Sequence, residues 1–186
     1  MTAQIPAPTP PTDDHPAETG QRDVQVLPIA SDTWVMRSRS WNRLRFEIEY
    51  ALEKGTTANS YLIRGNQIAL IDPPGTSFKD AFLVALTEEV DPNLIDYIIL
   101  GHTNPNRLET IKALIELAPQ SKIVCSNPAA IALKAADIEH PIQPVKSGSD
   151  LDLGQGHHLE FIPVPTPRYP DGMCSYDSYS EVLFTD

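Results

Sequence analysis

Tyr97-Ile-Ile-Leu-Gly-His-Thr-Asn-Pro-Asn-Arg-Leu-Glu-Thr110 is the stretch of sequence that decides the fold. Its apolar start, Tyr97 to Leu100, predicts a strand buried on both faces, and the spacing from Arg107 to Leu117 predicts an amphipathic helix. A short polar loop joins the two. Ligand sites in α/β sheets lie beyond the carboxyl ends of strands, so this loop is the candidate site for a metal or a substrate. Its candidate residues are His102, Asn104, Asn106 and Arg107.

The polar loop has two interpretations. One is ordinary capping, in which the Asn106 side chain accepts hydrogen bonds at the start of the following helix. The other is a metal site, because a strand followed by His-x-(His or Glu)-x-Asp-His resembles the metal-binding loop of β-lactamase-like metalloproteins. His102 keeps that pattern, whereas positions 104 and 106 are Asn and position 107 is Arg.

Composition restricts the class of protein. The 186 residues are 41% apolar, which suffices for one domain with a core. A net charge of −11 argues against nucleic-acid binding, because no basic patch could replace phosphate counterions. Cys125 and Cys174 are isolated thiols, no secretory signal opens the sequence, and no apolar run approaches the ~20 residues of a membrane helix. We therefore expect a cytoplasmic protein without membrane insertion.

The first part of the chain changes character near residue 24. Residues 1–23 are rich in Pro, Thr, Ala and Asp and predict a disordered Pro-rich tail. Short alternating segments then predict a β-meander, with a hairpin at Gly65-Asn66. The predicted strands are Val24 to Ala30, Thr33 to Arg37, Leu44 to Tyr50, Ser60 to Arg64 and Ile68 to Asp72.

Helices and strands alternate after Asp72. A helix is predicted from about Ser77 to Glu88, with Ser77 as its N-cap. Further elements are a strand at Lys122 to Cys125, a helix at Pro128 to Ala135, a loop at Lys146 to Gly156, a strand at His158 to Val164, a polar turn at Pro165 to Gly172 and a strand at Glu181 to Thr185. Antiparallel strands followed by βαβα units predict an α/β sandwich. Because no closing layer follows Asp186, we expect a fragment of a longer chain with an exposed apolar face.

Several motifs in order resemble one family. Trp34-Val-Met-Arg-Ser-Arg-Ser-Trp-Asn-Arg-Leu-Arg-Phe-Glu-Ile-Glu-Tyr50 and Lys54-Gly-Thr-Thr-Ala-Asn-Ser-Tyr-Leu-Ile63 look like the opening of flavodiiron proteins, most closely the cyanobacterial diflavin flavoproteins. Thr166-Pro-Arg-Tyr-Pro-Asp-Gly-Met-Cys-Ser-Tyr176 and Leu183-Phe-Thr-Asp186 are similar to later motifs of the same family. The resemblance covers roughly residues 24–186.

The resemblance implies a fold and an activity. Family members combine a metallo-β-lactamase-like αββα sandwich holding two irons with a flavodoxin-like FMN domain and, in cyanobacteria, a flavin reductase domain. This chain would supply a partial first domain, residues 24–186, incomplete at its C-terminal end, with neither iron nor FMN expected in it. The family reduces O₂, or NO in some members, with electrons from NAD(P)H passed through flavin, in head-to-tail dimers. A homodimer or heterodimer with another flavodiiron subunit is therefore expected.

The resemblance also assigns positions to the iron site. The ligands would fall at His102, Asn104, Asn106 and Arg168, with Asp186 at the bridging carboxylate, and Arg107 at the place of a nearby His. Only His102 and Asp186 match the family pattern. Asn offers a neutral oxygen, and Arg has no lone pair and adds positive charge, so these residues would expel iron. Asp186 could instead form a bidentate pair with one of the arginines in the former metal cavity.

Other polar residues have simpler explanations. His157 and His158 are adjacent in a strand and point to opposite faces, so they cannot chelate together, and a surface position explains them better. Asp72 and Asp171 are either catalytic or turn-forming residues, and the turn is favoured. His140 lies in a loop and has no evident partner in the sequence.

Three functions remain open from the sequence. The chain is either part of an O₂-reducing oxidoreductase that has a degenerate iron site and works with a ligand-complete partner, or a non-catalytic dimerisation module. A metal-dependent hydrolase is disfavoured, because metal-activated water needs the same absent ligands.

Overall fold

Two sheets form the framework of the protein, for which a computed structural model describes residues 22–41 and 56–186. The larger sheet has seven strands in the order β1-β2-β3-β4-β5-β6-β7. The smaller sheet has four strands in the order β11-β10-β9-β8. The strands are β1 (Arg22–Ala30), β2 (Thr33–Ser40), β3 (Thr56–Arg64), β4 (Ile68–Ile71), β5 (Ile95–Leu100), β6 (Lys122–Ser126), β7 (Ile142–Val145), β8 (Asp150–Gly154), β9 (His157–Pro163), β10 (Met173–Asp177) and β11 (Val182–Phe184).

Strand direction changes within the larger sheet. Strands β1 to β4 are antiparallel neighbours, which confirms four of the five strands of the predicted meander and the hairpin at Gly65-Asn66. Strands β4 to β7 are parallel, and helical crossovers connect them. The carboxyl ends of β4 and β5 therefore lie side by side, which brings the residues after each strand to one edge of the sheet.

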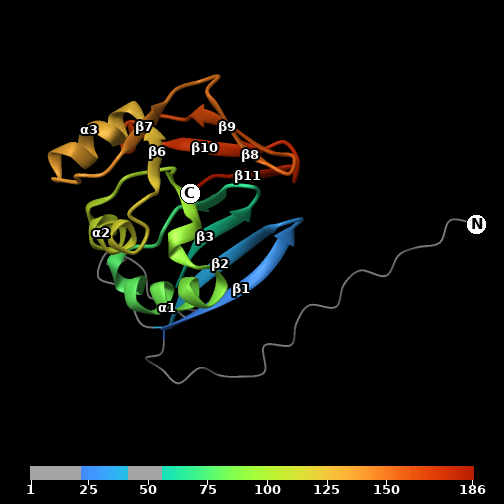
Figure 1. The fold of residues 1–186 in the computed structure, drawn as a ribbon. Helices are drawn as coiled ribbons and strands as arrows, with labels where there is room; N and C mark the ends of the chain where they lie inside the picture. The colour runs from blue at the N-terminus through green and yellow to red at the C-terminus, as the bar shows by residue number, and fades with distance from the viewer. Residues whose placement is uncertain (1–21, 42–55) are drawn as a thin grey trace, which may run out of the picture.

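Three helices cover one face of the larger sheet (Figure 1). They are α1 (Lys79–Glu89), α2 (Leu108–Leu117) and α3 (Asn127–Ala135), and short 3-10 turns occur at η1 (Thr76–Phe78), η2 (Pro92–Leu94) and η3 (Pro105–Arg107). Helix α2 turns Ile111 and Leu114 inward, as its apolar spacing predicts. Helix α3 is capped by Ser126, whose hydroxyl accepts from the Ala129 N–H, and Pro128 lies in its first turn.

Two apolar cores hold the layers together. Between helices and sheet lie Met36, Leu62, Phe82 and Ile98 with their neighbours. Between the two sheets lie side chains such as Ile99 and Phe161. Strand β5 contributes alternate residues to both cores, which confirms that it is buried on both faces. The observed layers are helix, sheet and sheet, three of the layers of the expected αββα sandwich.

Several predicted boundaries were wrong. Residues 22 and 23, assigned to the tail, begin β1, and the predicted loop from Lys146 to Gly156 contains β8. In β8, Leu151 and Leu153 face the core while acidic residues alternate with them, so the strand resembled a polar loop. Strands β7 and β10 were not predicted: β7 is an edge strand containing Pro144, and β10 turns polar residues such as Ser175 inward.

Two predicted helix caps were also wrong. Ser77 lies inside η1, and α1 starts without a side-chain cap bond. The capping residue of the loop from His102 to Arg107 was predicted to be Asn106, but it is Asn104. The Asn104 side chain accepts a hydrogen bond from the Asn106 N–H at 3.1 Å. The remaining predictions on the tail and on a strand at Leu44 to Tyr50 lie in residues outside those described.

Candidate functional site

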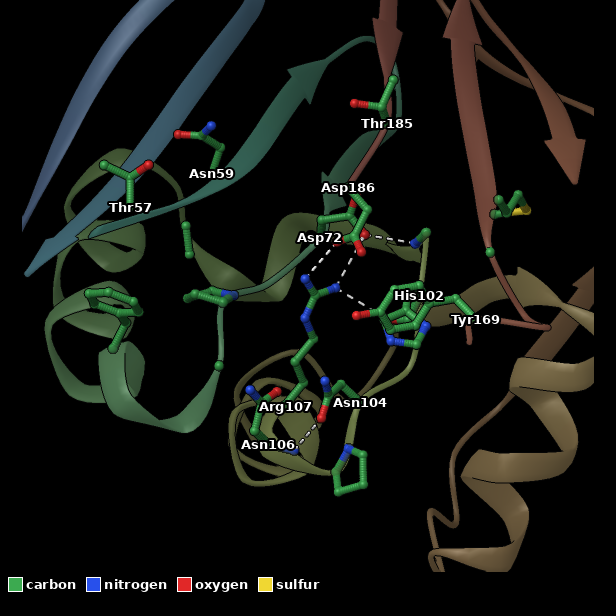
Figure 2. Close-up of a pocket in the computed structure, with 18 of the residues that line it drawn as sticks. Thr57, Asn59, Asp72, His102, Asn104, Asn106, Arg107, Tyr169, Thr185 and Asp186 are labelled. Carbon is green, nitrogen blue, oxygen red and sulfur yellow. Dashed lines mark hydrogen bonds and ion pairs between the residues drawn. The ribbon is translucent and has the colours of Figure 1, made fainter. Parts of the chain in front are cut away.

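A pocket of about 940 Å³ opens at the carboxyl ends of β4 and β5. Its walls come from the β5–α2 loop, the start of β3, the loop between β9 and β10, and the residues after β11. All six candidate positions line it: His102, Asn104, Asn106, Arg107, Arg168 and Asp186. Residues more than 80 positions apart in sequence therefore meet in one cavity, as Figure 2 shows.

Arg107 lies at the centre of an ion-pair cluster (Figure 2). One guanidinium nitrogen lies 2.5 Å from Asp186 Oδ1, and the other lies 3.8 Å from Asp72 Oδ1. The second nitrogen also donates to the His102 carbonyl at 3.2 Å. The expected pairing of Asp186 with an arginine is confirmed for Arg107, although through one close contact and not a bidentate pair. We call Asp72, Arg107 and Asp186 the ion-pair cluster.

Asp72 is more than a turn residue. Its positive φ of 52° fits the predicted turn, but its side chain is 2% exposed and accepts from the Gly101 N–H at 2.7 Å. Burial and the neighbouring Asp186 charge raise the pKa of Asp72 to about 7, and Arg107 and the Gly101 N–H only partly oppose them. The cluster therefore holds a buried carboxyl group that titrates near neutral pH.

Asp171 was predicted to be a turn former, and this was incomplete. It is 5% exposed, and its Oδ1 lies 2.8 Å from His102 Nδ1. Its Oδ2 accepts from the Thr103 N–H at 2.7 Å and from the Thr103 hydroxyl at 2.5 Å. Burial raises the pKa of Asp171, but the hydrogen bonds from Thr103 and His102 outweigh it and hold the pKa below its usual range.

Arg168 occupies the rim of the pocket. It is exposed, and its guanidinium carbon lies 5.4 Å from the centre of the Tyr169 ring. The Tyr169 ring in turn makes an edge contact with His102, with centroids 4.5 Å apart. Arg168 makes no ion pair with a described residue, so the cluster uses only one of the two arginines.

The donor set does not suit a metal centre. Within residues 22–41 and 56–186, no group of three or more His, Cys, Asp or Glu side chains could hold a metal ion. Asn104 already accepts from a backbone N–H, and Asn106 Oδ1 is buried with no hydrogen-bond partner in the described chain. Arg107 places a permanent positive charge between the two carboxylates. These residues fit an internal guanidinium better than iron.

The histidine pair behaves partly as predicted. His157 and His158 do face opposite sides of β9, but His157 is fully buried, so the surface interpretation was wrong for it. Its Nδ1 lies 2.7 Å from the buried Asp177 carboxylate. Burial raises the pKa of Asp177, but hydrogen bonds from Ser180 and His157 outweigh burial and hold this pKa below its usual range. His158 pairs with Asp150 at 2.9 Å.

The two cysteines and His140 lie outside the pocket lining. Cys125 and Cys174 are free thiols, and burial raises the pKa of Cys125 to about 12. His140 Nε2 lies 3.1 Å from the Ser121 hydroxyl, a partner that the sequence did not reveal. No helix in the described ranges is long and apolar enough to span a bilayer.

Known proteins resemble this chain in sequence and in fold. Residues 56–186 match the family model described as ODP family beta lactamase. The chain belongs to this family. It is 58% identical over 173 residues to a protein of Nostoc sp. (strain PCC 7120) that carries the name diflavin flavoprotein A 6. That match covers 91% of this chain and 30% of the relative, so the chain spans under a third of the relative's length.

Solved structures of the same kind share the fold of this ODP-family chain. The metal-soaked Flv1 flavodiiron core from Synechocystis sp. PCC 6803 superimposes with a TM-score of 0.83 at 57% identity, over 89% of this chain and 42% of that one. The rubredoxin oxygen:oxidoreductase of Desulfovibrio gigas gives a TM-score of 0.76 at 28% identity, over 86% of this chain and 40% of that one. The metallo-β-lactamase-like fold and the flavodiiron resemblance are thus confirmed.

Proposed function

We propose that this chain is the metallo-β-lactamase-like part of a flavodiiron-type oxidoreductase in which an ion-pair cluster replaces the iron centre. Close similarity to diflavin flavoproteins and to a flavodiiron core supports the class of protein. The longer protein would reduce O₂ to water with electrons from NAD(P)H passed through flavin. The chain itself would carry neither iron nor FMN, and it would act in the cytoplasm.

The observation that carries the proposal is the position of the Arg107 guanidinium. It lies between Asp186 and Asp72, where a bound cation would otherwise be needed to offset two carboxylates. A unit charge about 4 Å from another is worth about 4 kcal/mol at an effective dielectric of 20, and the repulsion of a divalent ion is larger. Iron would have to displace the guanidinium, and among the six candidate positions it would meet only His102 and Asp186 as its usual ligand types.

The six pocket residues are assigned to the iron-site positions of the family by this proposal. His102 and Asp186 keep the residue types of the family pattern, whereas Asn104 and Asn106 offer only neutral amide oxygens and Arg107 and Arg168 have no lone pair to donate. The proposed role of the pocket is structural, because the ion-pair cluster joins the ends of β4 and β5 to the residues after β11.

Such a chain would need a partner for O₂ reduction. We propose that it pairs with a flavodiiron subunit that keeps a complete ligand set. The same cluster also favours the second candidate, a non-catalytic module whose task is dimerisation. Co-expression distinguishes the two, because an active subunit raises O₂ consumption of the complex whereas a module leaves it unchanged.

Iron content tests the proposal. After anaerobic reconstitution with Fe²⁺, the chain should retain far less than one iron per molecule by elemental analysis. The matched variant, Asn104→Glu with Asn106→Asp, Arg107→His and Arg168→His, restores anionic and neutral donors and should retain substantially more. Stoichiometric iron in the unmodified chain would contradict the replaced-site proposal.

A further inference from the structure

Asp171 lies behind the pocket residue His102 and makes more contacts than a turn requires. Both of its oxygens are used: Oδ1 faces His102 Nδ1 at 2.8 Å, and Oδ2 takes two hydrogen bonds from Thr103. Its backbone is also held, because the buried Ser126 hydroxyl donates to the Asp171 carbonyl at 2.7 Å. Strand β6 thus fixes Asp171, and Asp171 fixes the loop that follows β5.

The ring of His102 is held from two directions. Asp171 contacts its Nδ1 edge, and Tyr169 meets the ring at 68° with centroids 4.5 Å apart. The loop that carries Tyr169 is itself closed by paired backbone bonds between Thr166 and Tyr169 at 3.0 and 3.1 Å. The ring therefore has one orientation, and the edge opposite Asp171 carries Nε2.

The direction of the proton follows from the partners of Asp171. The Thr103 N–H and hydroxyl both donate to Oδ2, and an ionised carboxylate can only accept. The hydrogen bond at Oδ1 must then be donated by the ring. We infer that Asp171 is a positioning residue that fixes neutral His102 as the Nδ1–H tautomer, with the Nε2 lone pair directed to the pocket.

This tautomer determines what His102 offers to a ligand. His102 lines the pocket, and no described residue hydrogen-bonds its Nε2. Arg107 and Arg168, which line the same pocket, are donors only. His102 is thus a fixed acceptor for a neutral ligand that carries an O–H or N–H group. The inference rests on the contacts of His102 and holds whether or not the proposed function does.

Nitrogen NMR of the histidine rings tests the inference. Long-range ¹H–¹⁵N correlation spectra, recorded at alkaline pH, distinguish the two neutral tautomers from each other and from the doubly protonated ring. The His102→Gln variant assigns the His102 signals by their loss. The wild-type chain should show the Nδ1–H pattern at His102, and an Nε2–H pattern would overturn the inference.

Two variants separate positioning from general structural support. In Asp171→Asn the amide oxygen can still accept from Thr103, so its NH₂ group faces Nδ1 and His102 should switch to the Nε2–H tautomer. Thr103→Val keeps the carboxylate and should leave the tautomer unchanged. An unchanged tautomer in folded Asp171→Asn would refute the role of Asp171. If that variant does not fold, the wild-type spectrum and Thr103→Val still decide the matter.

Discussion

Replacing Arg107 with Met removes the cation from the ion-pair cluster while keeping most of the side-chain volume. The Arg107 side chain is 18% exposed, and its partners Asp186 and Asp72 are 20% and 2% exposed. Breaking a buried pair by removing one partner costs about 3 to 5 kcal/mol, and the partial exposure of Asp186 places this case at about 3 kcal/mol. Whenever Asp72 is ionised, two like charges then face each other in the pocket.

The cost should depend on pH, because Asp72 can lose its charge. Its pKa is already raised to about 7, and removal of Arg107 raises it further. Near pH 8 the wild-type cluster holds two carboxylates that need the cation, whereas near pH 5.5 Asp72 is protonated and one charge is gone. We expect a loss of about 3 kcal/mol at the higher pH and about 1 to 2 kcal/mol at the lower.

Urea denaturation at both pH values measures the free energy of unfolding. Lys79→Met is the matched control, because Lys79 pairs with Asp80 only at 3.9 Å and Asp80 is 95% exposed. The control should change stability by no more than about 0.5 kcal/mol. Adding Asp72→Asn to Arg107→Met should recover part of the loss, since the unpaired buried charge is removed. Equal effects of Arg107→Met and Lys79→Met, or a pH-independent loss, would refute the reasoning.

Three further predictions follow from sequence and structure. Because the pKa of Asp72 is raised, the folded state binds the Asp72 proton more tightly than the unfolded state, so this proton contributes full stability below pH 3.8 and less as the pH rises to about 7. In Asp72→Asn this decline should be absent from the pH profile of the free energy of unfolding. A decline that persists in the variant would exclude Asp72 as its cause. A Cβ at Gly65 would lie 2.3 Å from the Leu153 carbonyl oxygen, so Gly65→Ala should cost about 2 to 4 kcal/mol. Gly148→Ala, which meets no atom within 4 Å, should cost about 1 kcal/mol through its positive φ alone, and similar losses in urea melts would contradict the steric argument. Residues 1–21 have too little apolar content to offset the entropy of ordering, so deleting them should leave the melting temperature nearly unchanged, and a drop of several degrees by calorimetry would oppose this.

The sequence predicted the elements whose apolar pattern is regular. Strand β5 and helix α2 were recognised because Ile98 to Leu100 are continuously apolar and Ile111 and Leu114 recur at helical spacing. Strand β10 was missed because its inward residues include Ser175 and Asp177, whose burial depends on partners elsewhere in the chain. Local patterns carry no information about such partners.

The pocket was predictable only in part for the same reason. The loop from His102 to Arg107 was identified because it follows a buried strand. The contacts of Asp171 with His102, 69 residues away, could not be read from spacing, and Asp72 has the appearance of a simple turn residue before two prolines. The sequence did place Asp72 directly after a strand, a position where functional residues of α/β sheets occur. A turn residue explains an Asp at that position equally well.

The guanidinium of Arg107 has a consequence for how the pocket matures. A bound metal must be delivered by the cell, can be withdrawn by a chelator and is lost when its ligands protonate. The cation between Asp186 and Asp72 is covalently part of the polypeptide, so it arrives with translation and is present in every folded molecule. The positive charge at this point of the pocket is therefore encoded in the amino-acid sequence and does not depend on the supply of a metal ion.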